Sequence, residues 1–164
     1  MIVAVGCDHA GYALKPRIFR AIEEAGHEVL DCGAHELDPA DDYPEFALAV
    51  GTALLEHRAQ RGILVCGSGV GVAIAACKIP HVRAAMAHDT FSARQGVEDD
   101  DMNVIALGSR VIGPELAAEV VAAFLAARFS GAARHRRRSE KVDAIERDAR
   151  AGAFDQDRKS GAAG

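Results

Sequence analysis

The residues best suited to chemistry in this sequence are a cysteine and the glycine-rich loop that follows it. Cys66 ends an apolar run, and glycines stand at positions 67, 69 and 71. Backbone N–H groups in such a loop, with the N-terminus of a following helix, form a site for an anion. Thiolates are favoured in that setting, so Cys66 could act as a nucleophile or as a base. Its position alone leaves open the alternative of a buried structural cysteine.

The place of this loop in the chain argues against a dinucleotide site. The dinucleotide-binding fingerprint has its glycines after the first strand and an acidic residue about 20 residues further on. Here the loop 67–71 follows the third apolar run. A nicotinamide-dependent oxidoreductase is therefore poorly supported, and we expect no dinucleotide cofactor.

Two polar residues follow the first apolar run of the chain. Asp8 and His9 follow residues 2–6, with only Cys7 between. Carboxylate and imidazole groups can bind sugar hydroxyls and transfer protons. The alternative for this pair is an aspartate that caps a helix and a histidine that is merely exposed.

A basic cluster stands near the C-terminus of an otherwise acidic chain, in the string RHRRR at 134–138. Arg134 and Arg138 are four residues apart, so they share one face of a helix. Paired guanidinium groups suit the capture of a phosphate. The alternative is a solvated helix face that binds nothing.

Short apolar runs alternate with longer segments of helical periodicity, and these elements must position the polar residues. We expect strands at 2–6, 28–32, 62–66, 82–87 and 104–107 and helices at 12–25, 43–57, 72–78, 90–97, 115–128 and 136–150. Five strands, each followed by a helix, favour one parallel sheet with helices on both faces. Because ligands bind at the carboxyl edge of such a sheet, we expect Asp8, His9 and Cys66 to face the same site.

The composition limits the class of protein. The chain has 164 residues, of which 49% are hydrophobic and 26% charged, with a formal net charge of −5. These values are typical of one globular domain and disfavour nucleic-acid binding, and no segment is apolar for long enough to span a bilayer. We expect no secretory signal at the N-terminus. The four cysteines form no CxxC pair, so we expect reduced thiols in the cytoplasm, with Cys7, Cys32 and Cys77 as packing residues.

Several strings of the sequence together resemble one family, the type B ribose-5-phosphate isomerases and the related galactose-6-phosphate isomerase subunits. The matching strings are GCDHAGYALK (6–15), DYPEFA (42–47), GILVCGSGVGVAIAA (62–76), VRAAMAHDTFSAR (82–94), NVIALGSRVIG (103–113) and ARHRRR (133–138). The resemblance implies a Rossmann-like three-layer α/β/α sandwich with a five-stranded parallel sheet. It further implies an isomerase domain at 1–150, a homodimer or tetramer with shared active sites, and no cofactor or metal. The small and polar residues at 151–164 predict a flexible tail.

The resemblance also assigns roles to individual residues. By analogy, Cys66 is the base that moves a proton between C1 and C2 of the sugar, and Asp8 and His9 contact the substrate. The loop formed by Gly67, Ser68, Gly69, Val70 and Gly71 is expected to hold the enediolate oxygens. Arg110, Arg134 and Arg138 match the positions that hold the phosphate and the rest of the substrate.

The chain departs from the family pattern within the acidic string EDDD at 98–101. Where the family often has a histidine credited with opening the furanose ring, this chain has Asp99, and Asp100 replaces an asparagine. Two interpretations follow. Asp99 itself does acid–base work beside Asp100, or the substrate needs no ring opening. A tetrose 4-phosphate meets the second condition, because its O4 carries the phosphate.

These observations predict an aldose–ketose isomerase of a sugar phosphate. The expected reaction converts ribose 5-phosphate to ribulose 5-phosphate by Cys66-based proton transfer through an enediolate. The alternatives are an isomerase of a tetrose 4-phosphate or a hexose 6-phosphate, and a sugar-phosphate-binding module without catalysis. A small sugar phosphate is the expected ligand in each case, with no nucleic-acid or membrane partner.

Overall fold

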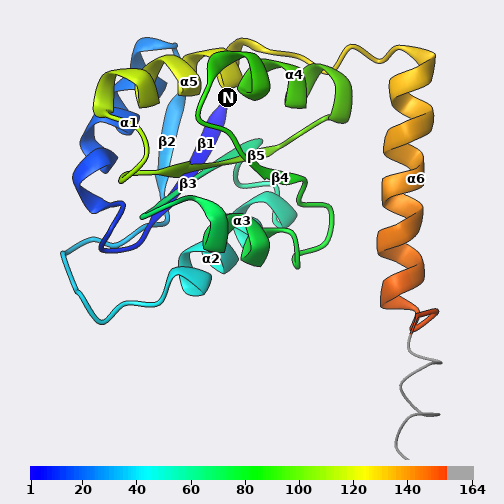
Figure 1. Ribbon diagram of the computed structural model, residues 1–164, viewed down its shortest axis with the longest axis horizontal. Helices are drawn as coiled ribbons and strands as arrows, with labels where there is room; N and C mark the ends of the chain where they lie inside the picture. The colour runs from blue at the N-terminus through cyan, green and yellow to red at the C-terminus, as the bar shows by residue number, and fades with distance from the viewer. Residues whose placement is uncertain (155–164) are drawn as a thin grey trace, which may run out of the picture. The chain divides into compact units, whose positions relative to one another are not determined.

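The computed structural model describes residues 1–154 (Figure 1). Residues 151–154, the start of the expected tail, form a turn, and the rest of that tail lies outside the described residues. The described residues divide into two compact units, one at Met1–Phe129 and a second that begins at Ser130. The first unit holds the sheet and the second holds one long helix, so each is described by itself.

Five parallel strands form a single sheet in the first unit. The strands are β1 (Ile2–Cys7), β2 (Glu28–Asp31), β3 (Arg61–Cys66), β4 (Ala84–Met86) and β5 (Val104–Gly108), in the order β2-β1-β3-β5-β4. All four pairings are parallel, which confirms the α/β prediction. The apolar strand β3 lies at the centre, because it is buried from Gly62 to Cys66 and could not face water.

The helices alternate with the strands as the periodicity predicts. A 3-10 turn, η1 (Tyr12–Leu14), precedes α1 (Lys15–Glu24); the others are α2 (Tyr43–Leu55), α3 (Val70–Ala76), α4 (Thr90–Asp100), α5 (Pro114–Ala126) and, in the second unit, α6 (Ala133–Arg150). The single predicted helix from residue 12 is divided because Pro16 fits only the first turn of an α-helix. Helix α4 extends past the predicted end at residue 97 and stops where Asp101 adopts a left-handed conformation.

Two apolar layers hold the sheet between the helices. Helices α1, α4 and α5 cover one face, while α2 and α3 cover the other (Figure 1). The first layer is built around Phe124, Ile18 and Ile22, and the second around Val50, Leu64 and Val72. These side chains are aliphatic with one aromatic exception, as the composition predicts.

The strand order creates a switch point between β1 and β3. From β1 the chain moves outward to β2, and it then returns to place β3 on the other side of β1. In open parallel sheets, ligands bind at the carboxyl ends of the strands beside such a reversal. The segment after β1 contains Asp8 and His9, and the segment after β3 contains the loop 67–71. The topology therefore brings both predicted segments to the same edge of the sheet.

Candidate active site

The thiol of Cys66 lies at the carboxyl end of β3, inside the turn that the glycine loop makes. The residue is 6% exposed, and the Gly69 N–H donates a hydrogen bond to its Sγ at 3.1 Å. Gly69 has a φ of +85°, a left-handed conformation that favours glycine. Helix α3 follows at once but has only seven residues. The N–H groups of the loop, and not the dipole of the short helix α3, therefore make this end of β3 a site for negative charge.

Gly108, the last residue of β5, sets the position of the loop. A Cβ built on Gly108 would lie 2.6 Å from both the carbonyl carbon and the carbonyl oxygen of Ser68. Only glycine permits this approach of two backbone segments. On the other side of the turn, the Val70 N–H lies 3.3 Å from Ser68 Oγ and donates to it. The loop therefore has little freedom to move away from Cys66.

Ser109 connects Cys66 to the segment after β1, and the sequence analysis gave it no role. Its backbone N–H donates to the Cys66 carbonyl at 2.8 Å, and its Oγ donates to the Ala10 carbonyl at 2.6 Å. The Asp8 N–H donates to the Val65 carbonyl at 3.3 Å. The segments that follow β1, β3 and β5 are thus joined directly, so Asp8, His9 and Cys66 share one edge as predicted.

Asp8 and His9 make different contacts. Asp8 is 6% exposed, and its Oδ1 accepts from the Gly11 N–H at 2.9 Å, so part of its carboxylate holds the turn after β1. The Nδ1 of His9 lies 2.6 Å from Asp41 Oδ1, which also accepts from the His9 backbone N–H at 3.1 Å. His9 is therefore held by a carboxylate that the sequence analysis missed. Asp41 lies in the Asp- and Pro-rich loop before α2, where no periodicity points to it.

Arg110 and Tyr43 flank the glycine loop. The Arg110 N–H donates to the Gly67 carbonyl at 3.0 Å, and a Cβ on Gly67 would lie 3.5 Å from the Arg110 guanidinium carbon. A Cβ on Gly71 would come within 2.9 Å of the Tyr43 ring. Arg110 thus lies beside the glycine loop, and its role in binding the phosphate stays a prediction. Tyr43 is an addition, and its only sequence signal is its place in the string DYPEFA.

One copy of the chain does not bring Asp99 and Asp100 to Cys66. Helix α4 begins just after β4, and the Asp101 carbonyl that follows its end accepts from Arg83, just before β4. The helix therefore runs from the carboxyl edge of the sheet back to the amino edge. Over its length, Asp99 lies about 15 Å along the sheet from the edge that holds Cys66. Asp99 Oδ2 accepts from Gln95 Nε2 at 3.2 Å, within α4.

Arg134 and Arg138 lie on α6 in the second unit, and this helix begins at Ala133, three residues before the predicted start at 136. Arg134 Nε donates to His135 Nε2 at 2.8 Å, and His135 Nδ1 lies 2.8 Å from Ser130 Oγ. Because Nε2 accepts, the ring hydrogen is on Nδ1 and the serine oxygen accepts it. The first unit thus contains the thiol and the loop, while the two predicted phosphate-binding arginines belong to the second.

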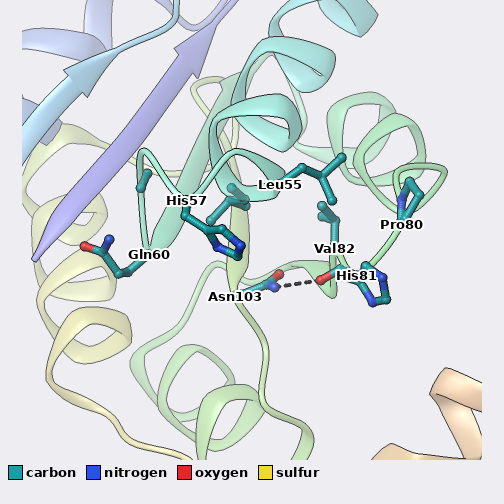
Figure 2. Close-up of a pocket in the computed structure, with 9 residues that line it drawn as sticks. Leu55, His57, Gln60, Pro80, His81, Val82 and Asn103 are labelled. Carbon is teal, nitrogen blue, oxygen red and sulfur yellow. Dashed lines mark hydrogen bonds between the residues drawn. The ribbon is translucent and has the colours of Figure 1, made fainter.

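A described pocket lies away from these residues. Figure 2 shows it lined by residues that include His57, Gln60, His81 and Asn103, where Asn103 Nδ2 donates to the His81 carbonyl at 2.8 Å. Gln60 directly precedes β3 and Asn103 directly precedes β5. The pocket is therefore at the amino edge of the sheet, opposite Cys66. Within residues 1–154, no group of three or more His, Cys, Asp or Glu side chains is arranged to hold a metal ion.

The other three cysteines differ in their surroundings. Cys7 is fully buried in the larger apolar layer, Cys32 is partly buried, and Cys77 is exposed. Burial raises the pKa of both the Cys7 and the Cys32 thiols. The packing role predicted for Cys77 is wrong, because its thiol reaches the surface and donates to the Ala84 carbonyl at 3.1 Å.

The buried Cys7 thiol is expected to make folding less favourable in alkali. Burial is the main cause that raises its pKa from 9.0 to about 11, partly opposed by Lys15. The folded state thus prefers the neutral thiol. Its contribution to the free energy of unfolding is complete below pH 9 and is lost as pH rises through 11. We expect a loss of at most about 2–3 kcal/mol over that window.

Urea unfolding between pH 7 and 11 measures this effect. The matched variant Cys7→Ala should lose less stability than the parent between pH 9 and 11, although it is less stable at pH 7. Equal alkaline losses in both proteins would contradict the assignment to Cys7.

The chain is similar to known isomerases over most of its length. The family model "Ribose/Galactose Isomerase" matches residues 3–142. Ribose-5-phosphate isomerase B of Escherichia coli is 42% identical over 144 residues, which cover 88% of this chain and 95% of that protein. D-erythrulose-4-phosphate isomerase of Pectobacterium atrosepticum is 42% identical over 132 residues, covering 79% of this chain and 85% of that protein.

The fold agrees with a solved structure as well. The structure of Clostridium thermocellum ribose-5-phosphate isomerase B superposes with a TM-score of 0.86 at 41% identity, covering 91% of this chain and 99% of that chain. This agreement confirms the predicted fold, and the family match confirms the resemblance that the motifs suggested. The chain belongs to the ribose/galactose isomerase family.

Proposed function

We propose that this protein interconverts ribose 5-phosphate and ribulose 5-phosphate, with Cys66 as the base. The observation that carries the proposal is the Cys66 sulfur, which accepts the Gly69 N–H at the mouth of a loop of amides. This arrangement sits at the switch point of a parallel sheet, where ligands bind. Two relatives that share about 40% of their residues with this chain carry the name ribose-5-phosphate isomerase B.

The chemistry requires a base, a site for a developing oxyanion and a grip on the phosphate. The Cys66 thiolate takes the proton from C2 of the open-chain aldose, and the thiol returns it to C1. Between these steps, the proton on O2 passes to O1, so the overall change is an isomerisation without loss of a proton. The N–H groups of the loop 67–71 stabilise the enediolate, and the Ser68 hydroxyl is a further donor.

Arginines provide the grip on the phosphate in this proposal. Arg110 lies against Gly67, next to the reacting end of the site. Arg134 and Arg138 lie four residues apart on α6, and the bond to His135 holds the Arg134 side chain. Binding energy from the phosphate orients the reacting carbons, which raises the rate of the chemical step.

A second copy of the chain completes the active site in this proposal. Asp99 and Asp100 lie at the edge opposite Cys66 within their own copy, so they reach a crevice only in a partner. The face formed by α3, β4 and the start of α4 exposes large apolar side chains that a partner would cover: Val70, Ile74, Met86 and Phe91. Exposed patches of this kind are typical of protein interfaces. We therefore propose a homodimer with shared sites.

Mixing two inactive variants tests the shared site. We expect Cys66→Ala and Arg138→Ala to be nearly inactive alone. If each site takes Cys66 from one copy and Arg138 from the other, a mixed dimer has one intact site. Random exchange of subunits should then restore up to about a quarter of the parent activity. Mixing that restores nothing, although sedimentation shows exchanged dimers, would contradict this arrangement.

A tetrose 4-phosphate is the second candidate substrate. Asp99 replaces the histidine that the family resemblance associates with ring opening, and a tetrose 4-phosphate forms no furanose. The relative from Pectobacterium atrosepticum, named for D-erythrulose 4-phosphate, is 42% identical to this chain. This candidate needs the same thiol and the same loop, so it changes the substrate and not the chemistry.

Initial rates with both sugars test the proposed function. We expect kcat/KM for ribose 5-phosphate to equal or exceed the value for erythrose 4-phosphate. Turnover of the tetrose alone would favour the second candidate. Binding of both sugars with no isomerisation of either would instead indicate a binding module.

Two observations bear on the compartment in which the protein works. Within the described part of the chain, no helix is long and apolar enough to cross a membrane. All four cysteines are free thiols. Free thiols are typical of a reducing compartment, and we propose that the protein is cytoplasmic.

A further inference from the structure

A histidine and an aspartate that are far apart in the sequence form a close pair beside the proposed active site. His9 Nδ1 lies 2.6 Å from Asp41 Oδ1, and the same oxygen accepts the His9 backbone N–H at 3.1 Å. The Asp41 side chain is only 9% exposed, whereas that of His9 is 35% exposed. The carboxylate is thus shielded from water while the imidazole reaches the solvent side.

The contacts of this pair assign the ring nitrogens of His9. A carboxylate only accepts hydrogen bonds, so Nδ1 carries the hydrogen and Nε2 keeps its lone pair. Among the described residues, none forms a hydrogen bond with Nε2 of His9. Asp41 Oδ2 is buried and has no hydrogen-bond partner within residues 1–154. A carboxylate that accepts the Nδ1 hydrogen fixes the tautomer and the orientation of the imidazole ring.

The pair lies at the edge of the sheet that holds Cys66. His9 follows β1, and Ala10, the next residue, accepts from Ser109 Oγ at 2.6 Å. Ser109 in turn donates its N–H to the Cys66 carbonyl at 2.8 Å. Ser109 therefore links the segment that contains His9 to Cys66, the proposed base, through two hydrogen bonds.

Two other polar side chains at this edge each have one atom engaged in a hydrogen bond within the fold. Asp8 Oδ1 accepts from the Gly11 N–H. His88 Nε2 accepts from the Gly108 N–H at 2.8 Å. Cys66 is already assigned to the proton transfer between C2 and C1 in the proposed function, so it is not assigned to ring opening as well. His9 thus combines an available ring nitrogen with a buried carboxylate partner at this edge.

We propose that the His9–Asp41 pair opens the furanose ring of the aldose phosphate before Cys66 acts; this inference rests on the proposed function. Nε2 takes the proton from the anomeric O1 hydroxyl, and the Asp41 carboxylate stabilises the imidazolium that forms. The C1–O4 bond breaks, O1 becomes the aldehyde oxygen, and Nε2–H gives its proton to O4. The pair ends in its starting state. His9 is then a catalytic residue, and Asp41 is its positioning residue.

The two directions of the reaction separate this role from a structural one. Ribose 5-phosphate enters largely as a closed ring, whereas ribulose 5-phosphate cannot close a furanose, because its O5 carries the phosphate. For Asp41→Asn we expect a loss of about 10-fold or more in kcat from ribose 5-phosphate, and His9→Gln should lose about 10²-fold. Initial rates from ribulose 5-phosphate should change less than about 2-fold, because the open-chain product closes without help.

Isotope effects and a matched variant complete the experiment. If ring opening limits the rate of the Asp41→Asn variant, the kinetic isotope effect on kcat from deuterium at C2 of ribose 5-phosphate should fall toward 1. Asp38→Asn makes the same change in the same loop. It should leave both rates unaltered, since Asp38 Oδ1 accepts only from the nearby Ala40 N–H, at 2.9 Å.

Each outcome decides the inference. An equal loss in both directions, or no loss in either, would overturn the role of the pair and leave the proposed function intact. A parent protein that isomerises neither sugar in either direction would overturn the proposed function, and the role of the pair with it.

Discussion

Replacing Cys66 with alanine is expected to lower kcat for isomerisation by about 10²–10⁴-fold, the contribution typical of a positioned acid–base group. The variant lacks the sulfur that accepts the Gly69 N–H at 3.1 Å, and water is a far weaker base at the same place. The thiol is small, so the fold should persist, and the thermal midpoint should stay close to that of the parent. Steady-state rates with ribose 5-phosphate and calorimetric titration with the same sugar measure the two effects.

The exposed thiol of Cys77 offers the matched control. Cys77→Ala removes an equal number of atoms and breaks only a contact with the Ala84 carbonyl, so its activity should remain near that of the parent. If Cys66→Ala retained most of its activity while folded, another base would have to move the proton. If the parent bound sugar phosphates without turning them over, the family fold would here serve a binding module.

Adding one methyl group at Gly108 is the second change with a large expected effect. A Cβ at this position would lie 2.6 Å from the Ser68 carbonyl group, so the loop 67–71 must shift away from β5. Displacements of about 1 Å in a catalytic group can cost 10²-fold in rate, and we expect a loss of that order in kcat. Overpacking of two backbone segments should also reduce the free energy of unfolding by about 1–3 kcal/mol.

Gly113 provides the comparison for this substitution. No atom lies within 4 Å of a Cβ built there, and its φ of −79° suits any residue. Gly113→Ala should therefore keep the activity of the parent. A Gly108→Ala variant with full activity would mean that the Ser68 backbone has room to move without affecting the reaction. Urea unfolding and steady-state kinetics of the two variants make the comparison.

The sequence itself determined the order of the elements and the edge at which Asp8, His9 and Cys66 meet. Apolar runs with their alternating helices are local signals, because each strand or helix must bury its own apolar side chains. Once the strands are parallel, their carboxyl ends share an edge by geometry alone. The motifs around Cys66 also identified the family, which the comparisons confirmed.

Residues in irregular segments could not be assigned in this way. Asp41 is 32 positions from His9 and lies in a loop without periodicity, so only the folded chain pairs them. The same holds for Ser109, whose two hydrogen bonds cross to segments that follow other strands. Long-range contacts of this kind depend on loop conformation, and loop conformation is set by the packed elements around it.

Asp99 shows most clearly the difference between what the sequence determines and what the tertiary structure decides. The family resemblance made Asp99 a candidate catalytic residue of a site shared between copies, and α4 carries it to the edge opposite Cys66 within its own copy. The sequence determined that this helix follows β4 and begins at its Asp89 cap, whose carboxylate accepts the Ser92 N–H at 2.7 Å. Only the tertiary structure decided which edge the end of the helix reaches, because a helix that returns the chain to a parallel strand must run opposite to the strands.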